Sequence, residues 1–86
     1  MTSDEFNEKY KAFLEEGHYG LSFDNERVTD MLDNIFKDLT LIPGFQYSQI
    51  KLKFGMPRFY SNLNSTRLMY MIEQEINEIV NKSFNG

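Results

Sequence analysis

The chain has 86 residues, 41% of them hydrophobic, with five glycines and two prolines, which fits one small folded domain and excludes a disordered or collagen-like chain. Because it contains no cysteine, a disulfide framework, a thiol nucleophile and a cysteine-ligated metal are excluded. The net charge of −4 is unevenly distributed: residues 1–38 carry ten acidic and four basic side chains, whereas residues 39–72 carry four basic and no acidic ones.

We therefore expect a single domain, residues 1–86, with regions of opposite charge. No apolar run approaches the roughly 18 residues that cross a bilayer, and the acidic N-terminus does not resemble a signal peptide. These features predict a cytoplasmic protein without membrane association.

The first predicted helix runs from Asp4 to about Glu16. Thr2 and Glu5 have the spacing of a capping box, and Gly17 fits the position that follows a helix. A single apolar stripe consists of Phe6, Tyr10, Phe13 and Leu14. The glycine-containing stretch 18–25 then predicts a loop, in which residues 19–23 can form a short extended piece.

The second helix is predicted from about Asn25 to Leu39, with Asp24 as its N-cap. Pro43 and Gly44 mark the connection that follows it. Its apolar residues keep the helical period over three turns and are Val28, Met31, Leu32, Ile35, Phe36 and Leu39. We expect this stripe to face the core.

Between residues 45 and 63 the hydrophobic period changes from 3.6 to 2, which predicts a β-hairpin. The side chains expected to point inward are Ile50, Leu52, Phe54, Phe59, Ser61 and Leu63. Residues 55–57 are the expected turn, and Pro57 must lie where the strand ladder needs no N–H donor. In particular, Phe54 is expected in the core, beside Phe36.

The last helix opens at residues 64–66 and carries an apolar series of Leu68, Ile72, Ile76 and Ile79. The predicted fold class is therefore α+β, with three helices packed on a two-stranded antiparallel β-hairpin in the order α-α-β-β-α. Because one hairpin is marginally stable alone, either the helices cover one of its faces or a second copy of the chain extends the sheet in a homodimer.

Residues 49–60 read Gln-Ile-Lys-Leu-Lys-Phe-Gly-Met-Pro-Arg-Phe-Tyr. This stretch resembles a Gln-hydrophobic-Lys-Glu-Lys-Phe-Gly-Gly-Leu-Arg-Phe-Tyr motif of uncharacterised small proteins from bacteriophages and prophages. The matching residues are Gln49, Lys51, Lys53, Phe54, Gly55, Arg58, Phe59 and Tyr60. Met56 and Pro57 depart from the motif, which changes the turn, and a pair of cysteines often found in that group is absent. The resemblance implies a phage or prophage origin and supplies no activity.

The sequence offers little for catalysis. His18 is the only histidine, and no nucleophile motif accompanies it. The carboxylates of the second helix lie at helical spacing on its expected solvent face, where paired-carboxylate chemistry has no cleft. There is no glycine-rich phosphate loop, calcium loop or zinc motif. We therefore expect a protein that is not an enzyme and that has no cofactor and no metal site.

The acidic N-terminal half predicts a partner-binding face if the first two helices lie side by side. Its candidate residues are Glu8, Glu15, Glu16, Asp30, Asp33 and Asp38. Spaced carboxylates can occupy a groove built for phosphates, so a phage-encoded accessory protein that binds and inhibits a host protein is the first functional hypothesis. A nucleic-acid-binding host enzyme is the kind of target expected, and an anti-CRISPR protein is an example of such an inhibitor. The alternative is an ordinary solvated helix surface.

The polar face of the hairpin predicts a second candidate surface, made of Tyr47, Lys51, Lys53, Arg58 and Tyr60. Cations interleaved with aromatic rings can bind single-stranded nucleic acid by pairing with phosphates and stacking on bases. The competing interpretation is that these cations only prevent edge pairing. Met69, Tyr70 and Met71 on the last helix are a third candidate, as adaptable apolar surface or as core filling.

Overall fold

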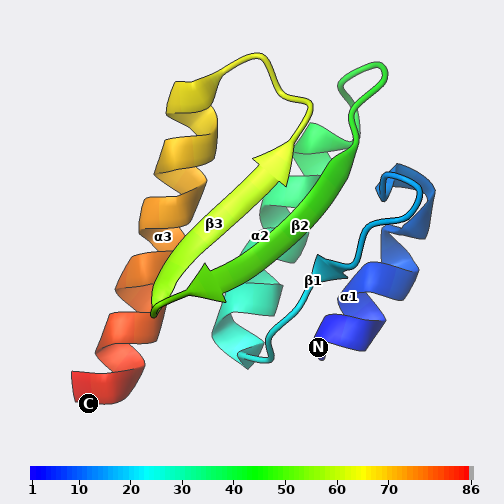
Figure 1. The fold of residues 1–86 in the computed structure, drawn as a ribbon. Helices are drawn as coiled ribbons and strands as arrows, with labels where there is room; N and C mark the ends of the chain where they lie inside the picture. The colour runs from blue at the N-terminus through cyan, green and yellow to red at the C-terminus, as the bar shows by residue number, and fades with distance from the viewer. Residues whose placement is uncertain (86) are drawn as a thin grey trace.

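The computed structural model describes residues 1–85 and the side chains of residues 1–82. It is an α+β fold in which helices lie against one face of a small sheet (Figure 1). The elements in chain order are α1 (Ser3–Lys9), a 3₁₀ turn (Lys11–Phe13), β1 (Gly20–Leu21), α2 (Glu26–Leu39), β2 (Tyr47–Lys53), β3 (Met56–Ser61) and α3 (Thr66–Asn85). In the described part of the chain, every helix falls short of the length or hydrophobicity needed to cross a membrane.

The sheet has three strands in the order β1-β2-β3, so the predicted two-stranded hairpin is incomplete. β2 and β3 pair antiparallel as expected, but β1 adds a parallel strand, with Gly20 opposite Gln49. The Asn7 side chain of α1 holds β1 in place, because its Oδ1 accepts from the Leu21 N–H and its Nδ2 donates to the Leu21 carbonyl, both at 2.9 Å. The short extended piece predicted within residues 19–23 is confirmed as β1, but its pairing with β2 was not predicted, because two residues give no alternation that a sequence could display.

The first helix is shorter than predicted. The Thr2–Glu5 capping box is confirmed, but α1 ends at Lys9, and the chain passes through the 3₁₀ turn into an extended segment. There the N–H of Glu15 donates to the carbonyl of Tyr47 at 2.8 Å. A tertiary hydrogen bond to β2 thus replaces the last turn of the predicted helix.

α2 follows the prediction apart from its cap. Asn25, rather than Asp24, is the N-cap, and its Oδ1 accepts from the N–H groups of Arg27 and Val28. The Asp24 carboxylate instead accepts from the Ser3 N–H at 2.7 Å, and this bond lowers the pKa of Asp24. The N-cap of α2 is therefore Asn25, one residue later than predicted, while the Asp24 side chain is bonded to the first residue of α1.

The core is built around the Phe36 ring of α2. Five aromatic rings lie within 6.2 Å of it, centroid to centroid: those of Phe6, Tyr10, Phe45, Tyr47 and Phe59. Ile50 and Ile72 are also buried, as predicted, whereas Leu52 and Leu68 are half-buried. Rings from α1, α2, β2 and β3 therefore share one aromatic centre.

The prediction that Phe54 lies in the core is wrong, since its side chain is 96% exposed. The turn consists of Phe54 and Gly55 and not of residues 55–57, because Lys53 already pairs with Met56. Both turn residues have positive φ, 54° and 78°, as a type I′ hairpin turn requires. The alternation that places Ile50 inward ends at Lys53, where the chain leaves the strand.

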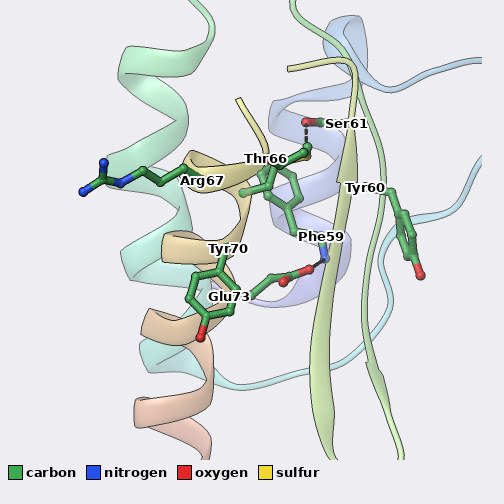
Figure 2. Close-up of a pocket in the computed structure, with 8 residues that line it drawn as sticks. Phe59, Tyr60, Ser61, Thr66, Arg67, Tyr70 and Glu73 are labelled. Carbon is green, nitrogen blue, oxygen red and sulfur yellow. Dashed lines mark hydrogen bonds between the residues drawn. The ribbon is translucent and has the colours of Figure 1, made fainter. Parts of the chain in front are cut away.

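The edge of β3 that faces away from β2 lies along α3. Phe59 directs its backbone N–H to this edge, where the Glu73 carboxylate of α3 accepts it at 2.9 Å (Figure 2). Pro57 is two residues away and occupies the equivalent position in the ladder, where its missing N–H leaves nothing unpaired. The prediction that Pro57 lies where no ladder donor is needed is confirmed.

Candidate binding surface

The face of β2 and β3 opposite the helices is open. Figure 1 shows the two strands in front of α2, with α3 running alongside β3. Ile50 and Phe59 point toward the helices and are 0% and 3% exposed. Strand alternation then places their neighbours on the opposite side. We call that side the outer face and define it by Lys51, Lys53, Met56, Arg58 and Tyr60.

Three cations and one aromatic ring gather on the outer face. Lys51 and Arg58 are directly opposite each other in the β2–β3 ladder. The Lys51 Nζ lies 5.9 Å from the centroid of the Tyr60 ring, a cation–π distance. Figure 2 shows Tyr60 pointing away from α3, and its side chain is 44% exposed. Because residues 39–72 contain no acid, neither strand supplies a carboxylate that would neutralise these cations.

Tyr47 does not belong to this surface, which corrects the prediction. It is fully buried, its ring is 5.0 Å from that of Phe36, and burial raises its pKa to about 12. The reason is a β-bulge: Tyr47 pairs with Ser61 and Gln49 pairs with Tyr60, so Ser48 is an extra residue without a counterpart. One inserted residue turns Tyr47 to the same side as Ile50.

The predicted acidic residues are distributed differently from a single free face. Asp33 is part of the contact between α1 and α2: its carboxylate accepts from the Tyr10 hydroxyl and lies 2.8 Å from the Lys9 Nζ. These two bonds, that from Lys9 first, hold the pKa of Asp33 below its usual value. Asp30 lies 3.7 Å from the N-terminal amine, and Glu15 lies 3.9 Å from the His18 ring.

Glu8, Glu16 and Asp38 are exposed and complete the predicted acidic set. Asp33, by contrast, is largely covered, with 17% of its side chain exposed. The acidic candidates therefore divide into a structural member, Asp33, and residues that are available to a partner.

Two grooves border α3. One lies between α2 and α3 and is apolar, lined by Ile35, Leu68, Tyr70, Met71 and Ile72 among others. Tyr70 and Met71 are 60% and 55% exposed there, whereas Met69 is half-buried against the core. The other groove, about 590 Å³ in volume, separates β3 from α3 and contains Arg67, Tyr70 and Glu73 (Figure 2). The sequence reasoning missed this second groove because its walls come from separate elements.

The lone histidine and the acidic side chains are the remaining residues considered for chemistry. His18 lies in an exposed loop, and Glu15 is its ion-pair neighbour. Within residues 1–85 no three His, Cys, Asp or Glu side chains are arranged to hold a metal ion. The outer face, by contrast, combines cations with an exposed aromatic ring, which are groups suited to binding another molecule.

The chain matches no protein-family model, no curated protein and no solved structure. The phage resemblance of residues 49–60 therefore stays a prediction from the sequence.

Proposed function

We propose that this protein is a non-enzymatic binding module that takes a single strand of nucleic acid on its outer face. The observation that carries the proposal is the row of Lys51, Lys53 and Arg58 that ends beside Tyr60, on a sheet face that no helix of the described chain covers. Such a face offers cations for phosphates and a ring for a base, which are the two elements of single-strand recognition.

The cations are spaced along the strands rather than clustered at one point. Lys51 and Arg58 form one cross-strand pair, and Lys53 lies two pairs closer to the turn, on the same side of the sheet. Alternate positions of a strand are about 6.6 Å apart, so the charges follow an extended line. A flexible single strand can follow this line, whereas a rigid duplex would meet the open face only at points.

The salt dependence of binding gives a quantitative expectation. Each phosphate neutralised on a single strand contributes about −0.7 to the slope of log K against log salt. Three cations on the outer face predict a slope of about −2. A slope near zero would contradict phosphate pairing.

A charge-reversal experiment tests the proposal. Fluorescence anisotropy with a labelled oligothymidylate about 12 nucleotides long measures affinity for wild type and for the triple variant Lys51→Glu, Lys53→Glu, Arg58→Glu. We expect the triple variant to lose binding. The matched control is Lys11→Glu, Arg27→Glu, Lys37→Glu, which makes the same change in net charge at exposed positions outside the hairpin. Equal loss in both variants would show that overall charge, and not the outer face, governs binding.

A second candidate function is favoured by the groove between α2 and α3. We propose as the alternative that a phage-encoded accessory protein binds and inhibits a host protein there, because Tyr70 and Met71 expose large apolar surface beside Ile35. Pull-down from host lysate should then recover a protein with wild type but not with Met71→Glu.

The acidic residues extend this test. Reversal of Glu8, Glu16 and Asp38 to Lys should weaken capture if the carboxylates also contact the host protein. Asp33 is left unchanged in this variant because it joins α1 to α2. Capture that survives both changes would exclude these surfaces.

A further inference from the structure

The hairpin tip carries a residue that the fold itself does not explain. Phe54 is the first residue of the turn, and among the described residues it is the only one other than glycine with a positive φ. Its side chain is 96% exposed, more than any other large hydrophobic residue of the described chain. The backbone is strained for a bulky side chain, and the ring has no compensating burial.

The position would be filled better by another residue if stability alone mattered. The first position of a type I′ turn favours Asn, Asp or Gly, because these residues tolerate positive φ. An exposed phenyl ring also gains nothing from the hydrophobic effect in the folded chain. The ring at position 54 therefore points to a contact made outside the molecule.

The surroundings of the tip connect it with the outer face. Lys53 and Met56 flank the turn directly, and both belong to that face. Tyr60 lies four residues beyond Met56 along β3, about 13 Å at the rise of a strand. Two aromatic rings, Phe54 and Tyr60, thus stand at the two ends of a row that contains the three cations.

We propose that Phe54 is a binding residue that stacks on an unpaired base at one end of the single strand held by the outer face, an inference that rests on the function proposed above. Tyr60 then stacks toward the other end, and Lys51, Lys53 and Arg58 pair with the phosphates between them.

A nucleic acid fits this arrangement better than a lipid surface. A bilayer would be reached by the protruding tip, so it would use Phe54, Met56 and Lys53 and leave Tyr60 without a role. A strand lying along the hairpin uses both rings and all three cations. The cations are spaced along the strands and are not gathered around the tip, which favours a nucleic acid over a lipid surface.

The test replaces Phe54 with Asn, which suits the backbone and cannot stack as a ring does. Because positive φ is tolerated by Asn, Phe54→Asn should melt at the same temperature as wild type or higher. Its affinity for the oligothymidylate should fall by about 5- to 150-fold, the loss that accompanies removal of one base–aromatic stack. Phe54→Tyr keeps both the strain and the ring, and it should retain wild-type affinity.

The controls separate this inference from the function on which it rests. Tyr19→Asn removes another exposed ring, 81% exposed and outside the hairpin, and should not change affinity. An oligonucleotide with 2-aminopurine at one end reports stacking directly: its fluorescence should be quenched by wild type and by Phe54→Tyr but not by Phe54→Asn.

The outcomes distinguish the role of Phe54 from the proposed function. If wild type binds the oligonucleotide and Phe54→Asn binds it equally well, the role of Phe54 is overturned and the function stands. If wild type does not bind it, both are overturned. Binding to phosphatidylserine vesicles that depends on Phe54, without binding to the oligonucleotide, would identify the tip as a membrane contact and also overturn both.

Discussion

The two faces of the hairpin use the same strands for opposite purposes. On the inner face, Ile50 and Phe59 are buried against the aromatic centre, whereas Lys51 and Arg58, one residue away along each strand, lie on the open side. The only difference between the two sets is the parity of their positions. A substitution on the inner face is therefore expected to affect stability, and one on the outer face to affect binding. Inserting one residue into a strand would move its side chains from one face to the other.

The largest expected difference between buried and exposed sites concerns two phenylalanines. Phe36→Ala should destabilise the fold by about 3–5 kcal/mol, because it empties the site that five aromatic rings surround. Phe54→Ala should change stability by no more than about 0.5 kcal/mol, because its ring is exposed. Urea denaturation measures both, and a similar cost for the two would mean that the tip packs against the body of the protein.

A smaller effect is expected where β1 meets α1. An Ala side chain at Gly20 would place its Cβ 2.4 Å from the Asn7 Oδ1, so the Asn7 bonds that hold β1 must shift. With the positive φ of 71°, we expect Gly20→Ala to cost about 2–4 kcal/mol. Gly44→Ala is the matched control, since Gly44 also has positive φ but nothing within 4 Å, and it should cost about 1 kcal/mol.

Equal losses for the two glycine variants in thermal or urea denaturation would contradict the close approach of Asn7. They would leave backbone conformation as the whole cause. A larger loss at Gly20 would show that the third strand depends on a side chain of α1.

The smallest effect concerns pH and the Asp33 contact between α1 and α2. The pKa of Asp33 in the folded protein lies below its ordinary value of 3.8. Its contribution to the free energy of unfolding is therefore complete above pH 3.8 and is lost as the pH falls through the pKa of the folded state. Asp33→Asn should cost about 1 kcal/mol at pH 7, and this difference from wild type should shrink steadily below about pH 4. Urea denaturation of both proteins at pH 7 and below about pH 4 measures this difference in stability. A difference that does not change with pH would exclude the carboxylate as its source.

Regular helix segments were predictable because their signals are local. The capping box at Thr2 and Glu5 and the apolar stripe of α2 each lie within a few turns of one helix, and both are confirmed. The burial of Ile50 and Phe59 followed from alternation inside regular strands.

The failures arose where distant parts of the chain decide local structure. The end of α1 depends on a hydrogen bond from the Glu15 N–H to the Tyr47 carbonyl, and the place of β1 in the sheet depends on the Asn7 side chain, although the extended conformation of β1 was predicted. The bulge at Ser48 and the turn at Phe54 each interrupt the alternation of faces along the strands. Neither residue type signals such an interruption in the sequence. As a result, Tyr47 is buried although the sequence predicts it on the surface, and Phe54 is exposed although the sequence predicts it in the core.

The pairing of the Phe59 N–H with Glu73 has a consequence for assembly. An incoming strand that docks on β3 needs a row of free donors, but Pro57 has none and the Phe59 donor is already bonded. Growth of the sheet from one molecule to the next along this edge is therefore opposed, as is any partner that binds by contributing a strand there. On the β3 side the hairpin can in this way present an open face without also presenting an open edge, so recognition and strand addition there are governed by different atoms of the same strand.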